Sequence, residues 1–286
     1  METLLAISRS LISWHLDPFV VLGLLAMQGL YLFMVERLWR KTGTSNRRAM
    51  WFWSLGILTL FVALESPLDS IGERSLLLVH MMQHELLFSV APPLLLLGLF
   101  PRLVTPLTRP VLKPLLRTRY THRLLQVFFS PYCTLVLWLL LLYAWHLPAL
   151  YLLALRSSSI HILEHLCFVV VGTLFWQQII EPVPGLVKMR PWAKIIYLAV
   201  GQMGLIPLVV VLVWSPSVLY SYYAGRTWQW GITALFDQHV AGLLMMGSEM
   251  LVALTAVGWI TLKALAFVHW QEGRPRPPAS GQMHID

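Results

Sequence analysis

Two pairs of histidines in this chain are spaced so that each pair can bind one metal ion. His80 and His84 are four residues apart, and so are His161 and His165. Four residues of an α-helix turn about 400°, so both rings of a pair lie on one face of the helix, roughly 6 Å apart. Two imidazoles at that spacing can share a metal ion. We predict that these four histidines are metal ligands and that their two helices bring the pairs together.

Further side chains near the two pairs have the chemistry to complete or support a metal site. Carboxylates beside metal-bound imidazoles often accept the second ring N–H and fix the tautomer, and thioethers suit copper(I). The additional or supporting residues that we consider are His146, His239, Asp237, Glu164 and Met81. Some also have a plainer explanation. A histidine at a helix end is commonly hydrogen-bonded, and methionine is an ordinary filler of irregular packing.

The composition places these histidines in a membrane protein. Hydrophobic residues make up 57% of the 286 residues and charged residues only 12%, whereas a soluble domain is about one quarter charged. The mean hydropathy is +0.68. A chain of this length suits about seven helices of roughly 20 residues with short connections. We therefore predict an all-α fold, a polytopic bundle of seven transmembrane helices.

Charged residues and turns rich in proline, glycine and serine separate the apolar segments. The predicted spans lie near residues 17–38, 49–67, 75–99, 127–147, 159–181, 193–215 and 235–268. Residues 1–270 would form this transmembrane domain, and residues 271–286 a short polar tail. The sequence APP at 91–93 predicts a kink in the third span, because proline cannot donate the helical hydrogen bond. A neighbouring helix must then satisfy the carbonyls that the kink frees.

The distribution of basic residues predicts the orientation of the bundle. Those on one side of the predicted spans are Arg40, Lys41, Arg47, Arg48, Arg102, Arg109, Lys113, Arg117, Arg119, Arg123, Lys188, Arg190, Arg274 and Arg276, whereas the other side has one arginine per segment. By the positive-inside rule, the N-terminus is outside and the C-terminus cytoplasmic. Both histidine pairs then face the outer side. The net charge of +8 accordingly indicates contact with anionic lipids on the inner leaflet, and nucleic acid is not an expected partner.

The types of donor favour copper. Histidine and methionine with nearby carboxylates suit copper better than a structural zinc site, although an open catalytic zinc site is an alternative on ligands alone. The two cysteines, Cys133 and Cys167, are predicted at different depths and do not form a disulfide. The pairs read HMMQH and HILEH, which is not the HExxH of metalloproteases, and no GxSxG occurs. The sequence therefore indicates a protein that is not an enzyme.

Three blocks of sequence carry a family resemblance. They are HMMQHELL…APPLLLLGLFP (80–101), WHLPALYLLALRSSSIHILEHLCFVVVGTLFW (145–176) and SPSVLYSYYAG…DQHVAGLLMMGSEM (215–250). In this order they resemble the multi-span CtaG family of cytochrome c oxidase assembly factors, and the likeness extends from about residue 60 to 260. The two HxxxH pairs and Asp237–Gln238 are its signature positions. The chain departs from the family's pattern at Met245–Met246, where an aromatic residue often follows a methionine.

The resemblance implies a multi-pass protein of the bacterial inner membrane that helps a haem–copper oxidase to mature by handling copper. Its partners would be subunits of that oxidase or a copper chaperone, and a homodimer is a further expectation. Residues and resemblance together predict a copper site that faces the periplasm, formed by His80, His84, His161 and His165.

Two alternatives stay open at this point. One is a haem-binding electron-transfer membrane protein, because imidazoles on facing helices can be the two axial ligands of a haem. The other is a copper permease. A permease needs a polar path across the whole bilayer, and the sequence shows no such path in the inner halves of the third and fifth spans.

Overall fold

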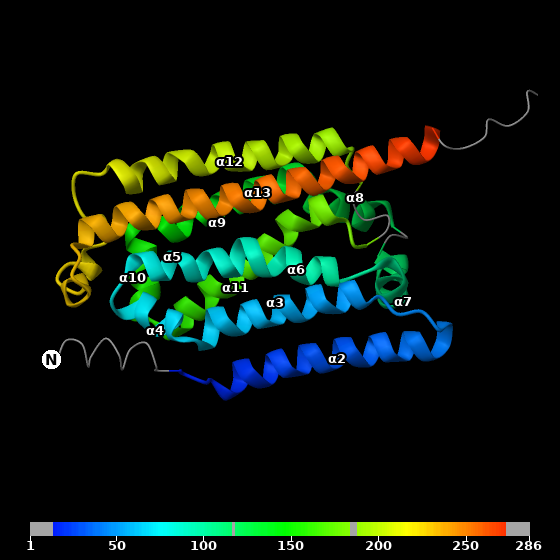
Figure 1. The fold of residues 1–286 in the computed structure, drawn as a ribbon, viewed down its shortest axis with the longest axis horizontal. Coiled ribbons are helices and arrows are strands. Elements are labelled where there is room, and N and C mark those ends of the chain that lie inside the picture. Colours follow the sequence, from blue (N-terminus) through cyan, green and yellow to red (C-terminus); the bar gives the residue numbers. More distant parts are fainter. Residues whose placement is uncertain (1–13, 116–117, 184–187, 273–286) are drawn as a thin grey trace, which may run out of the picture.

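The protein is a bundle of helices, seen in a computed structural model that describes residues 14–115, 118–183 and 188–272 (Figure 1). The elements are α2 (Pro18–Thr42), α3 (Arg47–Glu65), α4 (Pro67–Arg74), α5 (Leu77–Glu85), the π-helical turn η1 (Leu86–Val90), α6 (Ala91–Gly98), α7 (Pro101–Leu115), α8 (Arg119–Phe128), α9 (Pro131–His146), α10 (Pro148–Arg156), α11 (Ser158–Ile180), α12 (Pro191–Trp214), the 3-10 turns η2 (Ser221–Tyr223) and η3 (Thr227–Trp230), and α13 (Ala234–Glu272). All regular elements within these ranges are helical, as predicted.

Five of these helices are long and apolar enough to cross a membrane: α2, α3, α11, α12 and α13. A sixth candidate is the pair α8 and α9, which is bent by 50° between the two helices. The third predicted span, near 75–99, is divided among α5, η1 and α6, so each piece is too short to span alone. Seven spans and the orientation of the termini stay predictions. The predicted tail begins at residue 271, and residues 273–286 lie outside the described chain.

The break in the third predicted span follows from its prolines. In an α-helix the carbonyl of Phe88 would accept from residue 92, which is a proline and has no N–H. The π-helical turn η1 precedes this position. Gly172 of α11 lies against the Phe88 carbonyl oxygen, so closely that a Cβ atom at this position would collide with it. The helical hydrogen bonding is therefore irregular just before APP, and a glycine lets α11 approach this backbone.

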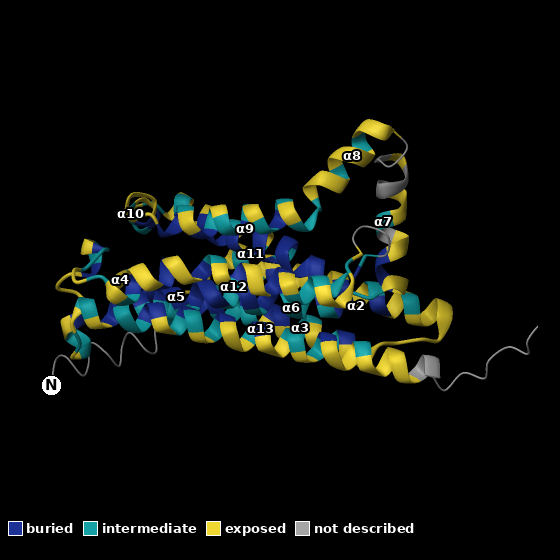
Figure 2. Ribbon diagram, turned by 90° about the horizontal axis from the view of Figure 1, so that it is seen from above, coloured by how far each residue is buried: buried dark blue, intermediate teal, exposed yellow. Residues whose placement is uncertain are grey.

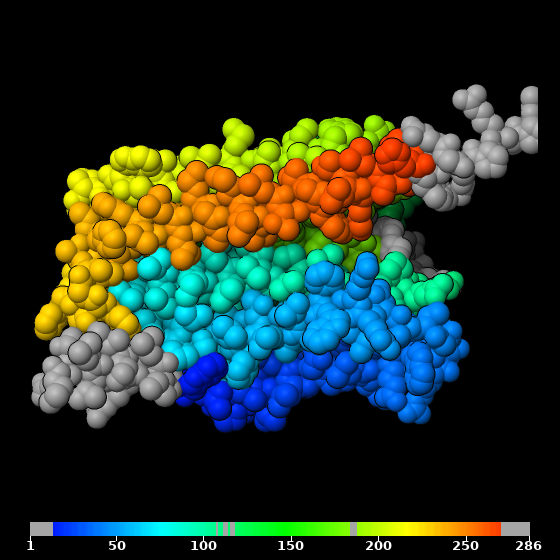
Figure 3. All heavy atoms as spheres, viewed as in Figure 1, coloured from blue at the N-terminus to red at the C-terminus, as the bar shows by residue number. Residues whose placement is uncertain are grey.

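The segment α5–η1–α6 is the centre of the bundle. It packs against α3, α11 and α13, while α9 and α12 lie further out and α2 packs on α3 at the edge. Figure 3 shows α13, the α5–α6 segment, α3 and α2 side by side on one face of the molecule. Glycines allow the closest contact: a Cβ atom on Gly98 would lie 2.9 Å from the Cα atom of Trp53. The glycine thus lets α6 approach the backbone of α3 closely.

Helices α7 and α8 lie at one end of the bundle, where Figure 2 shows them mostly exposed, and the start of α7 packs on α2 through the buried Leu103. Helix α8 has no buried residue, and its apolar Leu124 and Val127 are exposed. This helix also carries Arg119 and Arg123. Exposed apolar and basic side chains on one short helix are typical of a helix that lies in a membrane interface.

Several helices begin at a residue whose own side chain caps them. Asp17, Asn46, Ser66, Thr118 and Ser130 accept a backbone N–H from the first turn of α2, α3, α4, α8 and α9. Helix α5 begins after Leu76, which has no such side chain. Its cap comes instead from Asp237 on α13, whose carboxylate accepts the N–H groups of Leu77 at 2.7 Å and Leu78 at 3.1 Å. The helix that carries His80 and His84 is therefore held in place by a distant part of the chain.

Candidate metal centre

The two predicted histidine pairs meet inside the bundle. Helix α5 carries one pair and α11 the other, and the rings of His80 and His84 have centroids 4.2 Å apart, those of His161 and His165 4.1 Å. Across the two helices, His80 and His161 are separated by 5.5 Å and His84 and His165 by 5.7 Å. All four residues are buried. The spacing within each pair and the meeting of the pairs both follow the sequence prediction.

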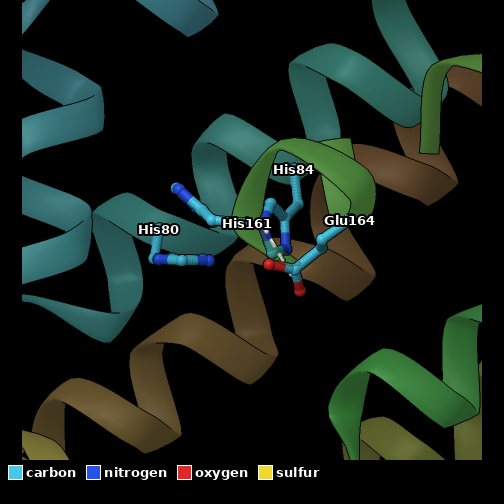
Figure 4. Close-up of side chains that lie close together, drawn as sticks. All are labelled: His80, His84, His161 and Glu164. Carbon is cyan, nitrogen blue, oxygen red and sulfur yellow. Dashed lines mark ion pairs between the residues drawn. The ribbon is translucent and has the colours of Figure 1, made fainter. Parts of the chain in front are cut away.

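A carboxylate completes the tightest group. One potential ligand atom each from His80, His84, His161 and Glu164 lie within 4.8 Å of one another. Figure 4 shows Glu164 beside His84, from which its carboxylate is separated by 3.9 Å. Glu164 is fully buried. We refer to His80, His84, His161, His165 and Glu164 as the histidine cluster.

His165 belongs to a second, overlapping group. Its ring and that of His161 share a 4.8 Å neighbourhood with the carboxylate of Asp69. His161 is therefore common to both groups, and His165 lies towards α4 rather than within the tightest four. The sequence predicts that four imidazoles share one ion. In the structure the tightest group has three of these imidazoles and Glu164, and His165 lies next to it.

Most of the ring nitrogens in the cluster have no partner. Among the described residues, the buried atoms without a hydrogen bond include His80 Nε2, both nitrogens of His84, His161 Nε2, His165 Nε2 and both carboxylate oxygens of Glu164. A buried polar atom without a partner costs about 1–3 kcal/mol. Several such atoms at one place, all of them able to donate an electron pair in their unprotonated form, are the arrangement that a cation satisfies.

The short helix α4 orients the outer imidazole. Glu73 Oε1 lies 2.6 Å from His161 Nδ1, which leaves the Nε2 atom of the ring for the cluster. The hydrogen bond from His161 lowers the pKa of the Glu73 carboxyl, an effect larger than the opposing effect of burial. A carboxylate that holds one nitrogen of an imidazole while the other faces a metal is a common supporting arrangement in metal sites.

Asp69 on the same helix is in a different environment. Burial raises the pKa of its carboxyl, and the hydrogen bond from Gln83 opposes this rise. Gln83 Nε2 donates to Asp69 Oδ1 at 2.6 Å and to the Ala63 carbonyl at 2.9 Å. Asp69 therefore links α4 to α5 as well as standing beside His161 and His165.

Sequence reasoning missed both acidic residues of α4. They lie in the connection between two predicted spans, where the sequence analysis expected no ligand. A signal was present, since Asp69 and Glu73 are four residues apart in a segment with a helix-capping Ser66 before a proline. This spacing places both carboxylates on one face of a helix. The close approach of α4 to α5 depends on Gly72, where a Cβ atom would lie 2.9 Å from the Cα atom of His80.

Four of the supporting residues that the sequence indicated, Asp237, His239, His146 and Met81, lie outside the two metal-compatible groups. Asp237 caps α5, as described above. His239 Nε2 lies 3.2 Å from the Ser215 carbonyl oxygen, so this histidine fixes the loop after α12. His146 Nε2 lies 3.3 Å from Met81 Sδ. Met81 and His146 are therefore in contact with each other, beside the rings of His80 and His84.

Tyrosines close the end of the bundle next to His80. Tyr223 donates a hydrogen bond to the Gly72 carbonyl at 2.8 Å, and the Tyr151 and Tyr223 hydroxyl groups lie 2.9 Å apart. These contacts connect α4, α10 and the segment between α12 and α13. Tyr223 Oη is also 3.5 Å from His80 Nδ1. The cluster thus lies beneath a covering formed by three segments.

The donor set fits a transition metal better than a hard cation. Imidazoles predominate, with one or two carboxylates, whereas Ca²⁺ and Mg²⁺ take oxygen ligands. In the described part of the chain both cysteines are free, and neither belongs to the groups that can hold an ion. The nitrogen and oxygen donors of the cluster are therefore of the types that suit copper or zinc.

Comparison with known proteins gives one match. The model of the family described as cytochrome c oxidase caa3 assembly factor (Caa3_CtaG) matches residues 29–266. This range includes the whole histidine cluster, α4 and Asp237. No curated protein and no solved structure matches the chain.

Proposed function

Because this chain belongs to the family of cytochrome c oxidase caa3 assembly factors, we propose that it assists oxidase maturation by binding copper at the histidine cluster and passing the ion to a partner. Copper is the cargo in this proposal, and the protein makes and breaks no covalent bond in a substrate. The partner would be an oxidase subunit or a copper chaperone. The proposed location is the bacterial inner membrane, with the cluster towards the periplasm.

The observation that carries the proposal is the convergence of unpartnered nitrogen atoms. Nε2 atoms of His80, His161 and His165 and both nitrogens of His84 are buried without a hydrogen bond among the described residues. Copper binds imidazole readily, and the mixed imidazole–carboxylate set accepts either oxidation state. The residues that would hold the ion are His80, His84, His161 and Glu164, with His165 available for exchange.

The haem alternative is less compatible with this geometry. Axial imidazoles must approach a haem iron from opposite faces of a flat macrocycle. Here a third imidazole and the Glu164 carboxylate lie within the same 4.8 Å group as the other two rings. Side chains therefore occupy the space that the macrocycle would need. A purified protein with copper and no Soret absorption is the expected result.

A buried polar network next to the cluster is the observation that bears on the permease alternative, because a permease needs a polar path. Ser248 donates to Glu85 Oε2 at 2.9 Å, and Gln202 Nε2 lies 3.3 Å from Glu249 Oε2. Ser89 of η1 donates to the other oxygen of Glu249. Three of its five members, Gln202, Ser248 and Glu249, lie on α12 and α13, outside the third and fifth predicted spans. Beyond Ser89, helix α6 reads APPLLLLG and offers no polar side chain.

Copper flux separates these two functions. In liposomes that contain the wild-type protein, we expect no copper uptake above that of protein-free liposomes, because the polar network ends at α6. The Glu249→Gln variant should behave in the same way. Uptake by the wild-type protein that is lost in Glu249→Gln would establish a permease and contradict the role of a carrier that exchanges copper with a partner at one side.

The ligand assignment is tested with a double variant. We expect His84→Ala together with His165→Ala to abolish retention of the clustered copper, measured by elemental analysis of the purified protein with its visible spectrum. His122→Ala, on the exposed helix α8, is the matched control and should retain the wild-type copper content. An unchanged copper content in a double variant that unfolds at the wild-type temperature would refute the assignment.

A further inference from the structure

A thioether and an imidazole face each other on the side of α5 that is turned towards α9. Met81 Sδ lies 3.3 Å from His146 Nε2. The Met81 side chain is fully buried and that of His146 is buried. Met81 directly follows His80 in the chain and is three residues before His84, so this contact lies immediately beside the histidine cluster.

Hydrogen bonding at the opposite side of the His146 ring fixes its tautomer. Nδ1 lies 2.7 Å from the Leu142 carbonyl oxygen. A carbonyl oxygen can only accept a hydrogen bond, so Nδ1 carries the hydrogen atom, and Nε2 of the neutral ring has a lone pair. A thioether sulfur has no hydrogen atom to donate. Two electron-pair donors are therefore directed at each other with no hydrogen atom between them.

A protonated imidazolium is the competing explanation of this contact. Burial of such a charge requires a counter-charge. In the ranges that the structure describes, His84 and His161 lie within ion-pair distance of a carboxylate, and His146 does not. The other contact of its ring is the neutral Leu142 carbonyl. A neutral ring next to sulfur is therefore the arrangement that the surroundings support.

We propose that Met81 and His146 form a second copper site, specific for copper(I), beside the histidine cluster. The inference rests on the proposed function and extends it. Thioether sulfur is a soft ligand that selects copper(I), whereas imidazole and carboxylate also bind copper(II) and zinc. Copper thus has two neighbouring binding sites, the histidine cluster and the Met81–His146 pair. The pair, which contains the soft sulfur ligand, retains copper(I).

The position of His146 is fixed by contacts that do not involve Met81. It is the last residue of α9, and its backbone carbonyl accepts a hydrogen bond from Tyr220 at 2.8 Å. The ring is therefore held at the start of the loop that precedes α10, independently of any ion. A preorganised pair of this kind binds an ion without the cost of ordering its side chains.

X-ray absorption at the copper edge tests the site directly. The full-length protein is loaded anaerobically with copper(I) in detergent, and its copper content is measured in parallel. We expect sulfur among the copper ligands of the wild-type protein, and loss of the sulfur signal with about one copper equivalent in Met81→Leu. Met82→Leu is the matched control, since Met82 is the neighbouring methionine, and it should keep both the sulfur signal and the copper.

The outcomes separate this inference from the proposed function. Copper bound through nitrogen and oxygen alone in the wild-type protein would overturn the second site and leave the histidine cluster intact. A sulfur signal that persists in Met81→Leu would also overturn it, because another sulfur would then be the ligand. If the sulfur signal survives in the His84→Ala/His165→Ala double variant while one copper is lost, both sites are supported as separate positions.

Discussion

The carboxylate of Asp237 accepts the backbone N–H of Leu77 at 2.7 Å, although 160 residues separate them in the chain. A second oxygen of the same carboxylate accepts the N–H of Leu78. The first turn of α5 is thus capped by α13, and α5 carries two imidazoles of the histidine cluster. Asp237 is a signature position of the family resemblance, and its contacts assign it to helix capping rather than to a ligand in this structure.

Removal of this cap should destabilise the protein and loosen the copper site. We expect Asp237→Ala to lower the free energy of unfolding by about 2 kcal/mol, at the upper end of the effect of a lost cap, because two buried N–H groups lose their acceptor. Copper retention should fall in parallel. Thermal unfolding in detergent and elemental analysis are the measurements.

The matched control for this variant is Asp17→Ala, which removes the cap of α2. Asp17 is exposed and far in the chain from the metal ligands, so its loss should cost less and leave the copper content unchanged. If Asp237→Ala and Asp17→Ala lose the same amount of copper, general destabilisation explains the loss, and the placement of α5 does not.

A second prediction concerns the orientation of His161 by Glu73. We expect Glu73→Gln to weaken copper binding about tenfold and Glu73→Ala up to about a hundredfold, since loss of a partner that orients a ligand typically costs this much. The amide of glutamine keeps an acceptor oxygen but not the charge. Competition with a copper(I) chelator measures the change in affinity.

Glu36→Gln provides the comparison, because Glu36 forms an exposed ion pair with Arg40 near the other end of the bundle. An exposed pair of this kind contributes little, and copper affinity should stay at the wild-type value. Equal affinities of the wild-type protein and Glu73→Ala would show that α4 has no part in the site.

A third prediction tests the close approach of α11 to the π-helical turn. A Cβ atom at Gly172 would collide with the backbone carbonyl of Phe88, and a backbone atom cannot move aside as a side chain does. We expect Gly172→Ala to lower the free energy of unfolding by about 1–3 kcal/mol, as overpacking of a core does. The unfolding temperature in detergent is the readout.

Gly247→Ala is the control for this substitution, since a Cβ atom at Gly247 would have no other atom within 4 Å. Alanine there should stabilise α13 by up to about 1 kcal/mol, the usual advantage over glycine in a helix. A Gly172→Ala protein as stable as the wild type would mean that α11 does not pack as closely against η1 as described.

A fourth prediction concerns α8 and the lipid surface. If this helix lies on an anionic leaflet, the double variant Arg119→Gln/Arg123→Gln should lose about 1 kcal/mol per arginine of the stabilisation that anionic lipid gives to the reconstituted protein. The measurement is the unfolding temperature of the reconstituted protein in anionic and in zwitterionic bilayers, for the wild-type chain and for the variant. If anionic lipid changes the unfolding temperature of the wild type and of the double variant equally, the placement of α8 in the interface is contradicted.

The histidine pairs could be predicted from the sequence because each pair lies within one helix and is defined by its spacing along the chain. A spacing of four residues fixes a shared helical face, and hydropathy fixes the depth of His80 and His161 in their spans. The same argument could have separated Asp237 from His239, since two residues of a helix turn about 200° and direct the side chains to opposite faces. Depth alone had placed both in one layer.

The remaining parts of the site depend on how helices pack, which hydropathy does not record. Asp69 and Glu73 reach the cluster because α4 folds back against α5 at Gly72. Met81 meets His146 because α9 lies beside that face of α5. Neither contact follows from the spacing or polarity of the residues involved. The prolines of APP predict a disturbance of the helix, whereas nothing in the sequence indicates the π-helical turn that precedes them.

The tyrosine covering has a consequence for the rate at which an ion is exchanged. Tyr223 hydrogen-bonds both Tyr151 and the Gly72 carbonyl, and His80 below it is fully buried. An ion bound there has no direct contact with water, so spontaneous dissociation must wait for α4 or the segment after α12 to move. Delivery would then be timed by the docking of a protein that displaces these segments, and stray ions from the medium would enter slowly.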